Sequence, residues 1–314
     1  MNKPNVVLIA GPTGVGKTAA SVILAKKLNT EIISCDSMQI YKGMDIGTAK
    51  VTKEEADGVA HHMTDIINPG ENFSVCDYVE MASKCIENIA KDGKIPLVVG
   101  GTGLYADSLL KGIDFQKDAP KDEDYRQYLF ELSEKEGVGF VHALLSEVDE
   151  VSAKAIHPNN VKRVIRAMEY YHATGEKISD HNERTKQTEP PYNSVRIYFT
   201  RDRQTLYERI DSRVDQMISD GLLEEVKSLI KNGINEDNTS MQAIGYKEIA
   251  DYLAGKTTLE DAINLIKQGS RHYAKRQLTW FKRDESGIWL NLDEFNSNEE
   301  VAKACLDIIK RRIP

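Results

Sequence analysis

The chain has 314 residues, of which 40% are hydrophobic and 29% are charged. This composition is typical of a globular protein of about two domains, and it excludes a wholly disordered chain. No segment approaches the roughly 18 consecutive apolar residues of a membrane-spanning helix, so we expect no membrane association.

Positive charge is clustered in a chain that is acidic as a whole. Lysine and arginine total 41 residues against 49 aspartates and glutamates, which gives a net charge of −8. Residues 154–168 nevertheless contain four basic side chains and no acidic one, and residues 267–283 contain six and none. A uniformly basic surface is therefore excluded, but segregated basic stretches are compatible with nucleic acid binding.

The cysteines and the N-terminus indicate the compartment. Cys35, Cys76, Cys85 and Cys305 include no Cys-x-x-Cys pair, so neither a zinc knuckle nor a disulfide framework is expected. The chain runs from Met1 almost directly into an apolar segment, without the regions of a signal peptide. We expect a cytoplasmic protein.

Apolar segments that alternate with helical ones predict an α/β fold. Residues 5–10, 31–36 and 95–99 are short apolar runs rich in β-branched side chains. Residues 19–28 are rich in Ala, Leu and Lys, which predicts a helix between the first two strands. This alternation implies a parallel sheet with helices on both faces, and such sheets bind ligands at the carboxyl ends of their strands.

The middle of the chain has a different pattern. Residues 117–136 are strongly charged and helical in pattern, and apolar residues recur at helical spacing over 161–171. We therefore expect a helical insertion domain over 116–190, within a core formed by 1–115 and 191–314. In the second part of that core a strand is expected over 195–199, and helices over 203–219, 222–232, 242–254 and 259–283.

Residues 11–18 match the phosphate-loop pattern Gly-x-x-x-x-Gly-Lys-Thr, between an expected strand and an expected helix. Backbone N–H groups, the helix N-terminus and Lys17 attract phosphate oxygens, and Thr18 can ligate Mg²⁺. A dinucleotide-binding pattern also fits residues 14–19, but it leaves the Lys-Thr pair unexplained. The predicted polyphosphate-binding residues are Gly11, Pro12, Thr13, Gly14, Val15, Gly16, Lys17 and Thr18.

Two further strand ends carry candidate chemistry. A nucleoside triphosphatase usually has a strand that ends in an aspartate near Mg²⁺, but the strand over 95–99 continues into Gly-Gly-Thr at 100–102. Asp36, at the end of the second strand, can fill that role, act as a base, or simply cap the following turn. Thr102 is either a ligand contact or a turn residue, and the glycines before it allow close approach to a ligand.

Several motifs together make the sequence similar to one family. The segments are 11–18, 36–41, 43–50, 61–62, 100–105, 209–217, 242–248 and 276–281. On these motifs the chain resembles the bacterial tRNA dimethylallyltransferases (tRNA isopentenyltransferases), from its N-terminus to about Asp284. The phosphate loop alone is shared by many families, whereas the other motifs taken together are highly specific.

The resemblance implies a P-loop NTPase-like parallel sheet flanked by helices, with a helical insertion domain. The family transfers a dimethylallyl group from dimethylallyl diphosphate to the exocyclic amine of the adenosine immediately 3′ of the anticodon in tRNA. By resemblance, the phosphate loop grips the diphosphate leaving group instead of splitting ATP, with Mg²⁺ as cofactor. The implied catalytic residues are Lys17, Asp36, Thr102 and Arg213, with Asp36 as the base toward the adenine amine and the last two on the diphosphate.

The resemblance also implies contacts with the anticodon stem-loop of tRNA, made by an enzyme that we expect to be a monomer. These contacts involve the second strand end, the insertion domain and two later segments. The implied RNA-binding residues are Asp36, Ser37, Met38, Gln39, Thr102, Arg126, Asn159, Asn160, Val161, Lys162, Arg163, Gln242, Ala243, Ile244, Gly245, Tyr246, Lys247 and Arg276.

Three other functions fit parts of the pattern. A small-molecule kinase with a lid would cleave ATP, with Asp36 assisting phosphoryl transfer. A free-nucleotide isopentenyltransferase is similar around the phosphate loop, but the insertion and the basic stretch over 267–283 favour an RNA substrate. A non-catalytic RNA-binding module leaves Asp36, Thr102 and Arg213 without a role.

Two features of the sequence also have a structural interpretation. On the last expected helix, Tyr273, Gln277 and Trp280 can form a stripe beside basic residues, although a solvated basic face is the usual role of such charge. Phe281 is expected in the core. The histidine pair at 61–62 is expected to be structural or to face RNA, because no third metal ligand accompanies it.

Overall fold

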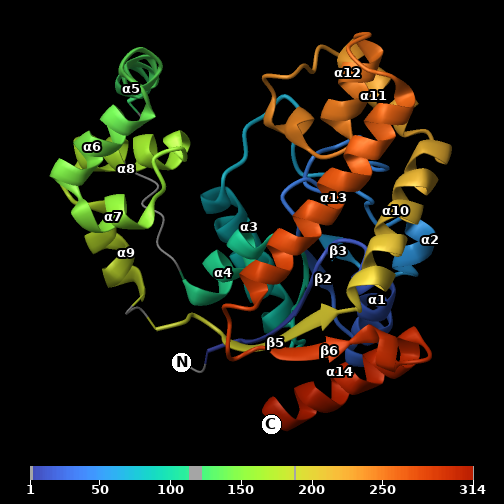
Figure 1. The fold of residues 1–314 in the computed structure, drawn as a ribbon. Helices are drawn as coiled ribbons and strands as arrows, with labels where there is room; N and C mark the ends of the chain where they lie inside the picture. The colour runs from blue at the N-terminus through green and yellow to red at the C-terminus, as the bar shows by residue number, and fades with distance from the viewer. Residues whose placement is uncertain (1–2, 113–121, 187–188, 314) are drawn as a thin grey trace. The chain divides into compact units, whose positions relative to one another are not determined.

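The structure, a computed structural model, describes residues 3–112, 122–186 and 189–313 (Figure 1). The chain forms two compact units, one of Met1–Leu110 with Pro191–Pro314 and the other of Lys111–Pro190. Each unit has its own hydrophobic core. The expected start of the insertion domain, at residue 116, lies outside the described residues.

The first unit is built on a 6-stranded sheet in the order β3-β2-β4-β1-β5-β6. Every pair of neighbouring strands is parallel. The parallel sheet expected from the alternating sequence pattern is thus confirmed. The strands are β1 (Asn5–Ala10), β2 (Ile32–Cys35), β3 (His61–His62), β4 (Leu97–Gly100), β5 (Asn193–Thr200) and β6 (Ile288–Asn291).

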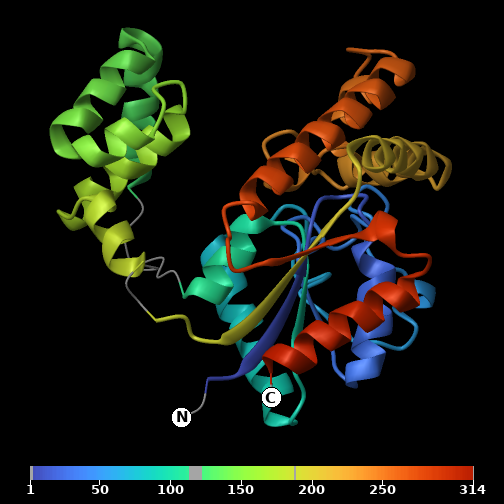
Figure 2. The ribbon, with the colours of Figure 1, turned by 60° about the horizontal axis from the view of Figure 1, so that its bottom comes forward.

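Helices cover both faces of this sheet, because its strands are apolar on both sides. Val7 and Ile9 of β1 face α1 (Lys17–Leu28) and α14 (Asn298–Arg312), while Leu8 faces α3 (Val75–Lys91) and α4 (Gly103–Lys111). Figure 2 shows α1 and α14 on one side of the strands and α3 and α4 on the other. The strands are therefore near-continuous apolar runs, as parallel sheets require.

A separate helical layer follows β5 and forms its own core. Its apolar cluster includes Tyr41, Met44, Val214, Tyr246 and Ile266, each of which is almost fully buried. The short helix α2 lies earlier in the chain, between β2 and β3. The bounds are α2 (Lys53–Ala56), α10 (Arg203–Ser219), α11 (Leu222–Lys231), the 3₁₀ helix η1 (Thr239–Gln242), α12 (Tyr246–Leu253) and α13 (Leu259–Phe281).

Over its described residues, the second unit is entirely helical. Its core gathers Leu129, Val141, Leu145, Val164 and Ile165, all 1% exposed or less. This matches the helical character expected for the middle of the chain. The helices are α5 (Glu123–Glu136), α6 (Val138–Val148), α7 (Glu150–Ala155), α8 (Val161–Thr174) and α9 (Ile178–Lys186).

The segment after Asp284 completes the first unit, a role that the sequence did not indicate. β6 pairs with β5 at the edge of the sheet, and α14 packs against α1. Asp284 itself accepts hydrogen bonds from Arg196 (2.9 Å) and Tyr198 (2.6 Å), which ties the end of α13 to β5. Phe281 is 3% exposed, as expected for a core residue. In the described parts of the chain, no helix combines the length and apolar character that crossing a bilayer requires.

Candidate active site

The phosphate loop, residues 11–18, connects the buried strand β1 to the N-terminus of α1. Lys17 is folded back onto the loop, where its Nζ donates hydrogen bonds to the carbonyl oxygens of Gly11 (2.8 Å) and Pro12 (2.9 Å). Thr18 is exposed in the first turn of the helix. The loop thus combines an ammonium group, a hydroxyl and a helix N-terminus, which together suit phosphate groups.

Three charged side chains interact electrostatically at this loop. Desolvation lowers the pKa of Lys17 to about 8; the charge of Arg213 acts in the same direction and that of Asp36 opposes it. Burial also lowers the pKa of Arg213, and Asp36 again opposes the shift. Arg213 makes no hydrogen bond or ion pair with any residue that the structure describes. Two cations beside one carboxylate leave a net positive site for an anion.

Two arginines that sequence reasoning missed hold the phosphate loop through its carbonyl groups. Arg201 Nε donates to the carbonyl oxygen of Val15 (2.9 Å), and Arg209 Nε donates to that of Gly14 (2.9 Å). Asp293, just after β6, accepts from Arg201 at 2.5 Å and fixes its guanidinium. These two arginines fix the shape of the loop through its carbonyl groups.

Asp36 follows β2 directly and caps the next turn with one carboxylate oxygen. Its Oδ1 accepts hydrogen bonds from the backbone N–H groups of Met38 (2.9 Å) and Gln39 (3.4 Å). Its Oδ2 has no hydrogen-bond partner in the described part of the chain. The capping interaction considered for this residue is therefore present, and it leaves the second oxygen for a ligand.

The register of the sheet brings Thr102 to the same turn. Cys35 of β2 lies opposite Gly100 of β4, so the two strand ends are neighbours. Thr102 Oγ1 accepts a hydrogen bond from the backbone N–H of Ser37 (3.1 Å), and its own N–H donates to the carbonyl of Cys35 (3.1 Å). The Thr102 side chain also acts on the pKa of Tyr273 in α13, so these two side chains lie near each other. Thr102 is thereby fixed beside the Asp36 turn.

The loop that follows this turn is held by a carboxylate from α11. Glu225 accepts hydrogen bonds from the backbone N–H groups of residues 45–47, at 2.9, 2.8 and 3.2 Å. It also accepts one from the hydroxyl of Tyr246 at 2.6 Å. Lys50 is largely buried and pairs with Asp65 at 2.7 Å. No pattern in the sequence predicts these contacts, which fix the segment between β2 and α2.

Replacing Glu225 by alanine is expected to lower the free energy of unfolding by about 2–4 kcal/mol, because hydrogen bonds to a charged group contribute about 1.5–3 kcal/mol and the abandoned donors add to the loss. Urea denaturation followed by circular dichroism measures the change. Glu224→Ala is the matched control, since Glu224 is exposed and pairs only weakly with Lys227 at 3.7 Å. Equal stability of the two variants would contradict the anchoring role of Glu225.

Comparison with known proteins places this site in a family. The sequence pattern described as IPP transferase matches residues 39–284, and that described as isopentenyl transferase matches residues 4–66. The tRNA dimethylallyltransferase of Lachnoclostridium phytofermentans is 47% identical over 306 residues, which cover 98% of this chain and 97% of the relative. The chain belongs to the IPP transferase family. The resemblance inferred from its motifs is confirmed.

Solved structures also agree with the assignment of this chain to the IPP transferase family. The tRNA isopentenylpyrophosphate transferase of Bacillus halodurans is 46% identical, with a TM-score of 0.73, and the match covers 99% of this chain and 98% of that one. A eukaryotic dimethylallyltransferase acting on tRNA is 31% identical, with a TM-score of 0.85, over 98% and 80% of the two chains. The expected P-loop NTPase-like parallel sheet is thus confirmed.

In the second unit of this IPP transferase, the residues predicted to bind RNA differ in their exposure and in whether they form ion pairs. Arg126 is held by Glu169, with Nε–Oε1 and Nη2–Oε2 distances of 2.7 and 3.0 Å. Lys162 and Arg163, in contrast, are exposed in the first turn of α8 and pair with no described residue. Exposed Asn159 and Asn160 and half-buried Val161 lie at the same helix start.

The segment 242–247 of this IPP transferase is divided between exposed and buried side chains. Gln242 and Lys247 are exposed, whereas Ala243 is 7% exposed and Tyr246 is completely buried. Gly245 is also buried and Ile244 half-buried. The expected helix over 242–254 begins only at Tyr246, because residues up to 242 form η1 and the backbone at Gly245 has a φ of 101°.

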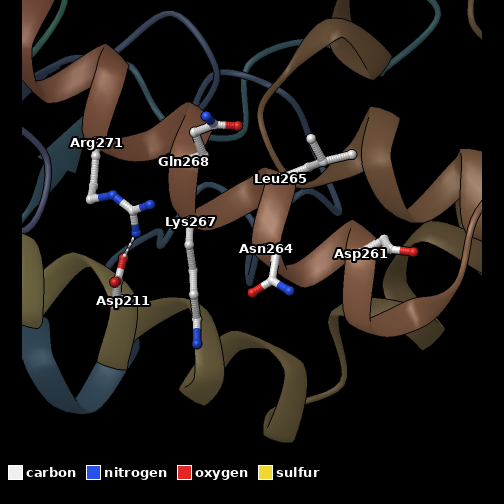
Figure 3. Close-up of a pocket in the computed structure, with 7 residues that line it drawn as sticks. All are labelled: Asp211, Asp261, Asn264, Leu265, Lys267, Gln268 and Arg271. Carbon is white, nitrogen blue, oxygen red and sulfur yellow. Dashed lines mark hydrogen bonds and ion pairs between the residues drawn. The ribbon is translucent and has the colours of Figure 1, made fainter.

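The basic stretch on α13 is partly neutralised by acids of α10. Lys267 pairs with Asp215 (2.6 Å) and Arg271 with Asp211 (2.5 Å). Figure 3 shows the surface hollow of about 750 Å³ along these helices, with the second of these pairs at its edge. Arg276 is exposed, and its guanidinium carbon lies 5.6 Å from the ring centre of Tyr273. The exposed positive charge is therefore concentrated nearer the C-terminal end of the helix. The residues that line the hollow are Asp211, Asp261, Asn264, Leu265, Lys267, Gln268 and Arg271.

The histidine pair of β3 has structural contacts. His62 Nε2 lies 2.7 Å from Glu31 Oε2, and His61 Nδ1 lies 2.9 Å from the carbonyl oxygen of Val59. No group of three potential His, Cys, Asp or Glu metal ligands occurs among the residues that the structure describes. The contacts with Glu31 and Val59 favour the structural interpretation of the pair.

Proposed function

We propose that this IPP transferase transfers a dimethylallyl group from dimethylallyl diphosphate to the exocyclic amine of the adenosine 3′ to the anticodon in tRNA, releasing diphosphate. One observation carries the proposal: Lys17, Asp36, Thr102 and Arg213 lie together at the phosphate loop of a chain that is 47% identical to a tRNA dimethylallyltransferase. A carboxylate with an unused oxygen and a positive cradle for a diphosphate are the parts that this reaction needs.

In this proposal the phosphate loop stabilises the leaving group. Negative charge grows on the diphosphate as its bond to the allylic carbon breaks, and the electron pair of that bond stays with the diphosphate. Lys17, Arg213 and backbone N–H groups of the phosphate loop stabilise this charge in a partly desolvated site. β4 ends at Gly100, where a triphosphatase would carry an aspartate, and this favours a diphosphate leaving group over ATP cleavage.

Mg²⁺ is the cofactor that we propose, and Thr18 is its protein ligand. The exposed Thr18 hydroxyl at the start of α1 fits a cation that takes most of its ligands from phosphate oxygens and water, as Mg²⁺ commonly does. When bound, the ion supplies positive charge against the diphosphate. The described residues offer no larger ligand cluster, which fits this sharing of ligands with the substrate.

Asp36 is the base in this proposal. Its Oδ2 accepts a hydrogen bond from the adenine amine and takes one proton as the new nitrogen–carbon bond forms. The amine is a poor nucleophile, so its alignment with the allylic carbon contributes as much as proton removal. In this proposal Thr102, which accepts a hydrogen bond from the Ser37 N–H, contacts the diphosphate, and the 36–39 turn contacts the extruded base.

We propose the anticodon stem-loop of tRNA as the partner, bound by a cytoplasmic monomer. Exposed Lys162 and Arg163 on α8, and Arg276 on α13, supply phosphate contacts. These clusters explain how a chain with a net charge of −8 can hold RNA. Within the second unit, Arg126 contributes through its ion pair with Glu169.

A transfer assay with labelled dimethylallyl diphosphate and Mg²⁺ tests the function, with unmodified tRNA, AMP and ATP offered in parallel. We expect label in tRNA alone. Label in AMP or ATP would assign the chain to free-nucleotide isopentenyl transfer, the activity suggested by the similarity of its N-terminal segment. ATP consumption without label in any acceptor would instead indicate a kinase.

Replacing residues 121–188 by a short Gly-Ser linker is expected to weaken tRNA binding at least tenfold, because the exposed basic side chains of α8 are lost. The affinity for dimethylallyl diphosphate should stay within about twofold, since the first unit has its own core and holds the whole phosphate loop. Filter binding and calorimetry measure the two affinities. Unchanged tRNA affinity would show that the second unit does not bind the RNA.

A further inference from the structure

One face of α13 contacts the loop that follows β4. Tyr273, Gln277 and Trp280 stand at helical spacing and lie on one face of the helix. Tyr273 lies near the Thr102 side chain, and Trp280 Nε1 donates to Asp107 in α4 (2.8 Å). The stripe of Tyr273, Gln277 and Trp280 that the sequence predicts therefore packs α13 against this loop. These three side chains are not part of a solvated basic face.

Gln277, in the middle of this stripe, is 5% exposed and joins two loops of the site. Its Oε1 accepts a hydrogen bond from the backbone N–H of Thr13 in the phosphate loop (2.9 Å). Its Nε2 donates to the carbonyl oxygen of Gly101 (2.9 Å). A single orientation of the amide satisfies both contacts, because the oxygen must face the N–H group and the nitrogen the carbonyl.

The fit between these parts is so close that two positions require glycine. A Cβ atom at Gly101 would collide with the Gln277 amide nitrogen and lie 3.4 Å from the carbonyl oxygen of Gly11. A Cβ atom at Gly103 would collide with the indole of Trp280. The Gly-Gly-Thr-Gly segment therefore forms the surface on which α13 rests. The phosphate loop and this segment therefore lie close together, and the Gln277 amide bridges them.

We infer that Gln277 is a positioning residue that sets the spacing between the phosphate loop and the 100–102 loop. A diphosphate held by the first loop is then aligned with Thr102, and through the adjoining turn with Asp36. The Thr13 N–H is committed to this bridge, so the phosphate loop binds its ligand with its remaining N–H groups. This role rests on the proposed function, because alignment matters only where two substrates react across the two loops.

Three variants test the bridge. Gln277→Met keeps the side-chain length and removes both hydrogen bonds. Gln277→Glu keeps an acceptor for Thr13, but it can donate to Gly101 only when its carboxyl group is protonated, and it then reproduces both contacts of the amide. Gln268→Met is the matched control, because Gln268 is an exposed glutamine on the same helix with no hydrogen bond to any described residue.

For Gln277→Met we expect kcat for transfer to tRNA to fall about 10- to 100-fold, since small misplacement of reacting groups has effects of this size. KM for tRNA should stay within about twofold, and Kd for inorganic diphosphate with Mg²⁺ should rise about tenfold. Gln268→Met should match the wild type in all three quantities.

The kcat of Gln277→Glu, divided by that of the wild type at the same pH, should rise as the pH falls from 8 to 5.5. Lys17, Asp36 and Tyr273 are present in both proteins, so their effects are common to both and cancel in this ratio.

Wild-type kcat and diphosphate affinity in Gln277→Met would overturn the inference, as would a flat pH ratio for Gln277→Glu. A higher KM for tRNA at unchanged kcat would also overturn it and make Gln277 an RNA contact. If the wild type transfers nothing to tRNA, the proposed function fails, while the diphosphate affinities of the variants still decide whether the bridge shapes the phosphate loop. Should Gln277→Met not fold, the pH ratio of Gln277→Glu remains decisive.

Discussion

Replacing Asp36 by asparagine is expected to lower kcat for transfer to tRNA by about 10²- to 10⁴-fold, the range attributed to a positioned general base. The affinity for tRNA should change by less than about threefold. Asparagine retains a side-chain oxygen that can accept from the N–H groups of Met38 and Gln39, so the turn is preserved. What it lacks is the second oxygen that takes a proton from the adenine amine.

Two comparisons separate the base from the cap. Asp36→Ala removes both roles, so it should lose activity like the asparagine variant and also lose about 1 kcal/mol of unfolding free energy, the usual contribution of a capping side chain. Asp57→Asn is the control, because Asp57 is exposed and pairs with Lys26 away from the loop. Single-turnover rates and filter binding give the two quantities. If Asp36→Asn lowered the rate and the tRNA affinity by equal factors, Asp36 would be an RNA-contacting residue and not the base.

Local sequence patterns were sufficient for the part of the site that lies at strand ends. The phosphate loop is a contiguous motif, and Asp36 and Thr102 each follow a short apolar strand. In a parallel sheet the carboxyl ends of neighbouring strands meet at one edge, so two such residues come together whenever their strands pair. The pairing of Cys35 with Gly100 does this here.

The contacts that the sequence did not reveal are hydrogen bonds between distant segments. Gln277 meets Thr13 across 264 positions, and Glu225 meets residue 45 across 180. Nothing local distinguishes these side chains from solvated ones, because periodicity records which face of a helix is apolar and not which backbone group a polar tip will meet. The ion pair between Arg126 and Glu169 could not be predicted for the same reason. β6 was missed because its four residues, all half-buried, form neither a run rich in β-branched side chains nor an alternating pattern.

Replacing Lys17 by alanine is expected to raise Kd for dimethylallyl diphosphate about 10- to 100-fold, because a hydrogen bond to a charged group contributes about 1.5–3 kcal/mol and each 1.4 kcal/mol is a factor of about ten. kcat should fall further than affinity, since the diphosphate gains charge as it leaves. Lys26→Ala, near the far end of the same helix, is the control. Unchanged affinity in Lys17→Ala would refute the assigned role.

The pH dependence of binding gives an independent test of the same residue. The pKa of Lys17 is lowered to about 8, chiefly by desolvation and then by Arg213. Below that pH the side chain is charged and attracts the diphosphate; as the pH rises through about 8 the free protein loses this charge, so the affinity for dimethylallyl diphosphate should fall. Ligand binding favours the protonated lysine, and so moves its pKa upward in the complex. Lys17→Ala should lose this fall between pH 7 and 9, whereas Lys26→Ala should keep it. The ligand's own ionisation is common to all three proteins, so a difference between their profiles reports Lys17 alone.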